Sequence, residues 1–212
     1  MKFWYNFLKW TLRLIFALPL YLRYSRVGSP DKNRHIFVSN HMSTLDPLMI
    51  MITLPEQISI LITGGVFSIP IVGRLLVKAG HIPVYNTDTY SAYQKAKSEL
   101  EHGRNILIFP EGQLSFEDGT IKPFFSGAAR LSLETDTSIV PIGVSMKKRW
   151  LKIPIKLAGK IEYARFYLLG TYNITVGKPF YLNYSEINST NKIQIQNKIK
   201  KQISQLLTKK LK

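Results

Sequence analysis

The sequence contains no cysteine and few acidic residues. Among its 212 residues, 13 Asp and Glu stand against 29 Lys and Arg, which gives a formal net charge of +16 at pH 7. The lack of cysteine excludes disulfides, thiolate zinc sites and cysteine nucleophiles, and it fits a reducing compartment. The shortage of acidic residues predicts a polyanionic partner, which could be nucleic acid or an anionic lipid surface.

A long apolar run is also missing. The uncharged stretch from Leu14 to Leu22 is shorter than the roughly 20 residues that a membrane-spanning helix needs. The first 26 residues are nevertheless rich in aromatic and aliphatic side chains, with cations spaced between them, and this predicts a helix that lies in a membrane interface with its charges toward the headgroups. Pro19 is expected to kink or end that helix. A cleaved signal peptide is the alternative, although no small-residue cleavage site follows Leu22.

No nucleic-acid-binding motif accompanies the positive charge, and the cations occur beside amphipathic, aromatic-rich ends. A membrane surface is therefore favoured as partner and nucleic acid is not expected. The basic and apolar segment 146–160 is interpreted as a solvated loop, with contact to anionic headgroups as the alternative. The basic amphipathic helix expected at about 189–212 would pack on the domain or contact the membrane. The cations of segment 146–160 are Lys147, Lys148, Arg149, Lys152, Lys156 and Lys160. The apolar stripe of the C-terminal helix consists of Ile195, Ile199, Ile203, Leu206 and Leu207.

A polar connector with Gly28 and Pro30 suggests a division into a membrane-associated segment, 1–27, and a main domain, 28–212. Within the main domain, patterns typical of strands and helices alternate. This alternation predicts an α/β fold with a mixed, largely parallel central sheet flanked by helices. Strands are expected at 35–38, 58–62, 81–85, 105–109 and 138–145, and helices at 48–54, 70–79, 89–101 and 127–134.

The junction after the first of these strands carries His41 and Asp46, five positions apart. On one regular helix the two side chains would point about 140° apart. They can meet only if His41 lies in the turn and Asp46 in the first turn of the next helix, a start that Ser43, Thr44 and Pro47 favour. An imidazole oriented by a carboxylate is a general base. An ordinary turn histidine beside a helix cap is the alternative interpretation.

A second motif, Phe109-Pro110-Glu111-Gly112, follows the strand expected at 105–109. Proline ends the strand, glutamate supplies a carboxylate, and glycine permits close approach of the backbone to a ligand. Because ligands bind at the carboxyl ends of strands in open α/β sheets, this loop and the His41 loop are expected at one edge.

The sequence Asn40-His41-x4-Asp46 followed by Phe109-Pro110-Glu111-Gly112 resembles the glycerolipid acyltransferase family, best known from the 1-acylglycerol-3-phosphate acyltransferases. Two weaker blocks, 80–84 and 140–142, occur in the family's order. The resemblance implies acyl transfer from acyl-CoA or acyl carrier protein to a lysophospholipid hydroxyl, at the cytoplasmic face of the cell membrane, in phospholipid biosynthesis. It implies His41 as the base, Asp46 as its orienter, and Asn40, Glu111 and Gly112 as substrate-binding residues. No metal or other cofactor is implied.

The chain departs from the family pattern at two phosphate-binding arginines. Gln113 and Leu114 follow the Glu-Gly pair, and Tyr85 and Asn86 end the second block. Substitute cations could be Lys122, Arg130 and Arg74, although lysine lacks the bidentate fork of arginine. An acceptor without a phosphate, or a non-catalytic lipid-binding protein, therefore remains an alternative.

Overall fold

The structure is a computed structural model that describes residues 2–17, 20–27, 33–146, 151–157, 160–167 and 170–208. Its centre is a seven-stranded sheet in the order β1-β9-β6-β2-β5-β3-β4. Every neighbouring pair in it is parallel except β6–β9. The predicted largely parallel sheet is confirmed. Its strands are β1 (Leu20–Arg26), β2 (His35–Ser39), β3 (Ile58–Thr63), β4 (Ile82–Val84), β5 (Asn105–Ile108), β6 (Ser138–Met146) and β9 (Gly170–Val176).

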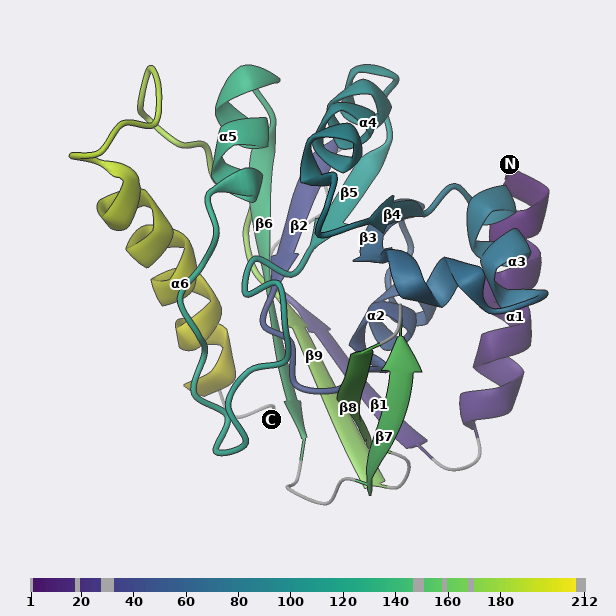
Figure 1. Cartoon of the computed structure of the whole chain (residues 1–212). Coiled ribbons are helices and arrows are strands. Elements are labelled where there is room, and N and C mark those ends of the chain that lie inside the picture. Colours follow the sequence, from purple (N-terminus) through teal and green to yellow (C-terminus); the bar gives the residue numbers. More distant parts are fainter. Residues whose placement is uncertain are drawn as a thin grey trace.

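Helices cover both faces of this sheet, and α1 and α6 lie on opposite sides of it (Figure 1). The central strand β2 reads as an apolar run because both its faces are buried. Phe37 packs into the core beneath α1, α2 and α3, whereas Ile36 and Val38 pack beneath α4, α5 and α6. The helices are α1 (Lys2–Ala17), α2 (Asp46–Thr53), α3 (Val72–Ala79), α4 (Thr89–Glu101), α5 (Gly127–Glu134) and α6 (Lys192–Thr208), with a short 3₁₀ helix η1 (Gly64–Ser68).

The predicted elements of the main domain are found with small shifts at their ends. Helix α4 spans the predicted residues, and Gly103 follows it with a positive φ of 80°. Strand β4, which contains Pro83, lies at the sheet edge, as a proline in a strand predicts. Helix α6 buries Ile195, Ile199, Ile203 and Leu206 against the domain, which confirms the packing interpretation of the C-terminal stripe.

The segment 146–160 differs from the expected loop. Strand β7 (Leu151–Leu157) pairs with β8 (Lys160–Phe166) in an antiparallel two-stranded sheet of its own. The sequence Leu-Lys-Ile-Pro-Ile-Lys-Leu of β7 has the period-two alternation of a strand; Pro154 and the flanking lysines obscured that signal. Residues 147–150, three of which are basic, lie outside the described residues.

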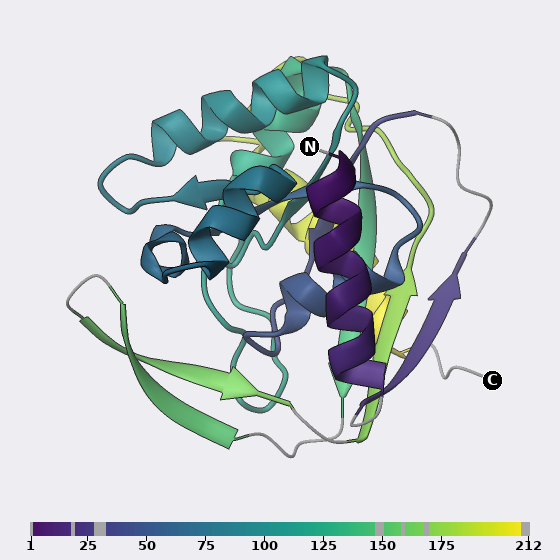
Figure 2. The same cartoon turned by 90° about the vertical axis from the view of Figure 1, so that its right-hand side faces the viewer.

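The N-terminal segment is integrated into the main domain. Helix α1 packs against α2 and α3, and β1 pairs with β9 at the sheet edge (Figure 2). The predicted boundary after residue 27 therefore does not separate two packed units in the part of the chain that the structure describes. Helix α1 ends at Ala17, and Pro19 lies outside the described residues. None of the described helices combines the length and the apolar character needed to cross a bilayer.

The prediction of an interfacial helix assumed that the cations of α1 point away from the protein, toward lipid headgroups. Two of them instead point toward the protein. Lys9 Nζ donates to the carbonyl of Leu54, and Arg13 Nε donates to the carbonyl of Ile52 at 2.7 Å. The last carbonyls of a helix lack partners within it and carry partial negative charge, so they attract cations. Lys9 and Arg13 thereby attach α1 to the C-terminal end of α2.

Candidate active site

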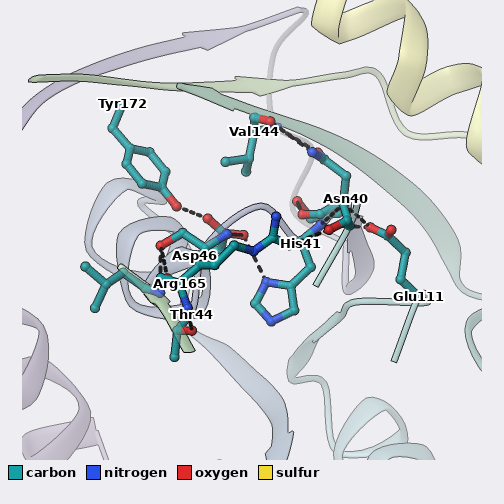
Figure 3. A network of polar contacts seen from close by, with 12 residues as sticks. Asn40, His41, Thr44, Asp46, Glu111, Val144, Arg165 and Tyr172 are labelled. Atoms are coloured by element: carbon teal, nitrogen blue, oxygen red, sulfur yellow. Dashed lines mark hydrogen bonds and ion pairs between the residues drawn. The ribbon is translucent and has the colours of Figure 1, made fainter. Parts of the chain in front are cut away.

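The His41 loop joins the end of β2 to the start of α2. His41 lies in the turn and Asp46 is the first residue of α2, so the two side chains meet with 2.9 Å between Nδ1 and Oδ2 (Figure 3). This is the arrangement that the five-residue spacing required. The predicted side-chain cap is not formed: Leu45 occupies the N-cap position, and Ser43 Oγ accepts from the Leu45 amide at 3.2 Å.

Asp46 is fully buried and held by several donors. Its Oδ2 accepts from the Ser43 amide at 2.8 Å as well as from His41, and its Oδ1 accepts from the hydroxyl of Tyr172 on β9. Burial raises the pKa of the Asp46 carboxyl, while the hydrogen bond and charge of His41 and the amide of Ser43 lower it. The carboxylate is thus fixed in orientation from both of its oxygens.

The His41 ring is fixed on one face and on one nitrogen. The ring of Phe109 stacks on it with 4.3 Å between centroids and 28° between planes. With Nδ1–H donating to Asp46, the lone pair lies on Nε2. The His41 side chain is 18% exposed whereas Asp46 is 0% exposed, so the imidazole connects a buried carboxylate to the surface. This is the geometry of a general base and its orienter.

Glu111 joins the two predicted motifs through its carboxylate. Its Oε1 accepts from the His41 amide at 2.9 Å and from Ser115 Oγ at 2.7 Å, and its Oε2 accepts from the Lys122 amide at 2.7 Å. The two loops therefore lie at the same edge of the sheet, as predicted from the parallel arrangement of β2 and β5. Glu111 is 1% exposed, and these contacts favour a role in holding the loops together.

Gly112 adopts a φ of 64°, in which its own amide donates to the Phe109 carbonyl at 3.0 Å. Because it is used within the turn, this amide is not available to hold an oxyanion in this arrangement. A Cβ at this position would approach the Phe125 ring to 2.8 Å. The glycine is needed because the turn is left-handed and closely packed.

Asn40 uses its side chain within the protein. Its amide nitrogen donates to the Val144 carbonyl at 2.9 Å, and its amide oxygen accepts from the Val144 amide at 2.8 Å. Asn40 is 0% exposed. These contacts favour attachment of the His41 loop to β6 over direct contact with substrate; a substrate-binding role for Asn40 stays a prediction.

The predicted substitute cations separate into two groups. Lys122 lies at the site: its amide contacts Glu111, and its Nζ lies 5.0 Å from the centre of the Phe116 ring. Arg130, on α5, instead covers the Tyr93 ring and pairs with Glu134 at 3.6 Å. Arg74 is exposed on α3. Of these three predicted substitutes, Lys122 alone contacts the loops of the site.

Three residues of the site were not predicted from the sequence: Tyr172, Ser115 and Arg165. Arg165, on β8, donates from Nη2 to the Ser115 carbonyl, and its own carbonyl accepts from the Thr44 amide at 2.8 Å. Its charge interacts with Glu117, Asp46 and Glu111. Ser115 could have been found from its place just after the Glu-Gly pair, but Tyr172 and Arg165 lie beyond the recognised motifs and carry no local signal.

Comparison with known proteins identifies the family of the chain. The model of the Acyltransferase family matches residues 24–145, more than half of the chain. The chain belongs to this family. The 1-acyl-sn-glycerol-3-phosphate acyltransferase of Borreliella burgdorferi is 34% identical over 116 residues, which cover 53% of this chain and 46% of the relative. The lyso-ornithine lipid O-acyltransferase of Pseudomonas aeruginosa is 28% identical over 141 residues, covering 66% and 53%.

The fold is shared with a solved acyltransferase structure. The 1-acyl-sn-glycerophosphate (LPA) acyltransferase of Thermotoga maritima aligns with a TM-score of 0.70 at 17% identity, covering 98% of this chain and 81% of that one. The match to the curated relatives is partial: the chain spans about half or less of the length of those from Borreliella burgdorferi and Brassica napus.

Proposed function

We propose that this protein is a membrane-associated O-acyltransferase of phospholipid synthesis, acting at the cytoplasmic face of the cell membrane. It would move an acyl chain from acyl-CoA or acyl carrier protein to a lysophospholipid hydroxyl, with 1-acylglycerol-3-phosphate as the expected acceptor. The observation that carries the proposal is the contact of His41 Nδ1 with Asp46, which leaves Nε2 as the base beside the Glu111 loop.

The chemistry follows from that orientation. His41 Nε2 takes the proton of the acceptor hydroxyl while the hydroxyl oxygen forms a bond to the thioester carbonyl carbon. The carbon–sulfur bond then breaks, and the departing thiolate of the carrier takes that proton from the imidazolium. Asp46 stabilises the imidazolium between these steps and keeps the ring in the reactive tautomer. The buried Tyr172 hydroxyl keeps the Asp46 carboxylate in place.

A second acceptor class is favoured by one departure from the family pattern. Leu114 stands where the family has a phosphate-binding arginine. One of the similar proteins, the lyso-ornithine lipid O-acyltransferase, is named for an acceptor other than 1-acylglycerol-3-phosphate. An acceptor without a phosphate group is therefore the second candidate. Lys122 is the cation that would serve a phosphate-bearing acceptor.

Membrane association is supported by the outer face of α1. Phe3, Phe7, Trp10 and Leu14 recur at helical spacing and are 46–69% exposed. An apolar stripe that the protein itself leaves uncovered fits an interfacial helix. The exposed apolar face of α1 would provide the contact with the membrane, and Lys9 and Arg13 would not.

The test is turnover of labelled acyl thioesters with two acceptors, one with a phosphate and one without, by three variants. His41→Ala is expected to lose about 10²- to 10⁴-fold in rate, because it removes the general base. Asp46→Asn should lose a comparable factor, because an amide cannot stabilise the imidazolium. His102→Ala is the matched control, since His102 is exposed at the end of α4.

His41→Ala activity within about tenfold of the parent, in a folded protein, would contradict the proposal. No turnover by the parent protein with either acceptor and either carrier would instead favour a non-catalytic lipid-binding protein. If only the phosphate-bearing acceptor reacts, Lys122→Ala should raise KM for it.

A further inference from the structure

The β7–β8 hairpin stands apart from the main sheet. It forms a separate two-stranded sheet and projects from the body of the protein (Figure 2). A two-stranded hairpin is marginally stable in water unless something covers an apolar face. The apolar side chains that the hairpin exposes therefore indicate what kind of surface or medium covers it.

Apolar side chains are exposed on both faces of the hairpin. Ile161 and Tyr163 are 70% and 68% exposed and share one face, since Tyr163 is opposite Pro154. Leu151 and Ile153 are 52% and 39% exposed and lie on the other face, where Ile153 is opposite Ala164. Packing on a single partner surface would cover only one of these faces. A medium that surrounds the strands can cover both.

The charge of this region selects among such media. Residues 147–160 contain six Lys and Arg and no Asp or Glu. Within the hairpin, Lys152 pairs with Glu117 of the loop that follows the Glu-Gly pair. Clusters of four to eight cations beside apolar and aromatic side chains are attracted to anionic lipid headgroups. Apolar exposure on two faces, combined with this charge, fits the interfacial region of an anionic bilayer.

We propose that the β7–β8 hairpin is a second membrane-contact surface, which inserts Ile161 and Tyr163 among anionic lipids independently of α1. Membrane contact by the hairpin does not depend on the proposed acyl-transfer function. Only its purpose does, which is to bring the catalytic loop to the lipid acceptor. The occupant is a lipid surface. An acidic protein such as an acyl carrier protein is the rival that the experiment separates.

The same hairpin is bonded to the His41 loop. The Arg165 carbonyl accepts from Ser43 Oγ at 3.0 Å as well as from the Thr44 amide, and the Arg165 amide donates to Thr44 Oγ1 at 3.1 Å. One end of β8 is therefore attached to the loop between His41 and Asp46, while Ile161 and Tyr163 lie toward its other end. Insertion of the exposed end places the catalytic base at the membrane surface.

The absence of cysteine from the sequence makes a direct test simple. Ile161→Cys, carrying an environment-sensitive fluorophore, is mixed with vesicles of phosphatidylcholine alone or with phosphatidylglycerol added. The matched control is Ile193→Cys on α6, where the parent side chain is 65% exposed. Both are made in the His41→Ala protein, so that turnover does not enter the measurement.

The expected result is a blue-shifted emission at position 161 with anionic vesicles, quenched by brominated lipid tails, and no shift at position 193. No shift at 161, or equal shifts at both positions, would overturn the proposal. A shift at 161 produced by acyl carrier protein and not by vesicles would overturn it in favour of a protein partner.

A binding measurement keeps the test independent of the label. The double variant Ile161→Glu/Tyr163→Glu should partition into anionic vesicles about tenfold or more weaker, because it withdraws two apolar side chains from lipid and adds negative charge against anionic headgroups. The control Ile193→Glu/Tyr181→Glu adds the same charge at two exposed positions away from the hairpin. Unchanged partitioning of the hairpin variant, with an unchanged circular dichroism spectrum, would contradict the proposal even if acyl transfer is confirmed.

Discussion

The two terminal helices, α1 and α6, both pack apolar side chains on the protein but differ in what they leave exposed. Helix α6 buries its aliphatic stripe against the sheet. Helix α1 packs Tyr5, Leu8 and Leu12 on the core and turns Lys9 and Arg13 toward the carbonyls of α2. It leaves a second apolar stripe outside, made of Phe3, Phe7, Trp10 and Leu14. The spacing of apolar residues therefore identifies a helix but does not reveal which of its apolar faces meets the protein.

The two docking surfaces also differ in how much titratable groups contribute to them. Helix α6 docks mainly through aliphatic side chains, which do not titrate, and through Lys200 Nζ, which donates to the Ile121 carbonyl at 2.6 Å. Helix α1 docks through Tyr5, whose hydroxyl accepts from the Ile58 amide at 3.2 Å, and through Lys9. Burial raises the pKa of Tyr5 to about 12 and lowers the pKa of Lys9 to about 8. His81 lies beneath Tyr5, with 6.1 Å between the ring centres.

The largest expected effect comes from the same substitution placed on each helix. Ile199→Asp buries an unpaired carboxylate beneath α6 and should lower the free energy of unfolding by about 4 kcal/mol or more. Ile15→Asp is the matched change on α1, where the side chain is 58% exposed, and should change it by less than about 1 kcal/mol. Urea unfolding measures both. Equal losses would mean that the exposed face of α1 packs on protein.

A smaller effect is expected from acidification. Burial lowers the pKa of His81 from 6.5 to about 4, with the charge of Arg104 acting in the same direction. Between those values the unfolded chain binds a proton that the folded chain does not, so stability falls as pH drops through this window. At pH 5 the loss is about 2 kcal/mol.

His81→Asn tests this pH dependence, because asparagine can still accept from the Ile60 amide, which His81 Nδ1 does at 3.3 Å. Thermal unfolding from pH 7 to 4.5 should show a shallower decline for the variant than for the parent. Parallel curves would show that His81 is not the group that responds.

The smallest effect is expected from Lys9→Met. It removes the donor to the Leu54 carbonyl while keeping the apolar stem, and should cost about 1 kcal/mol, the net contribution of one hydrogen bond. Lys2→Met, at an exposed position of the same helix, is the control. If the two variants are equally stable, Lys9 contributes nothing measurable to the attachment of α1.

The main-domain elements could be predicted because their hydrophobic periods are local. The strand at 105–109 and the helix at 89–101 follow from residues close in sequence, and so does the need for His41 and Asp46 to meet across a turn. Strands β1, β7, β8 and β9 were missed. Tyr172 contacts Asp46 over 126 positions, and a contact over that separation leaves no periodic signal in either segment.

The sequence by itself determined the alternation of strands and helices, the family and the base-and-carboxylate pair, because each depends on the spacing of neighbouring residues. Only the tertiary structure decided that Asn40 and Glu111 hold loops together, that Arg165 and Tyr172 support the His41–Asp46 pair, and that Lys9 and Arg13 of α1 point inward. Those outcomes depend on which buried polar groups find partners on distant strands. A buried donor or acceptor is costly without a partner, and the partner is chosen by the fold.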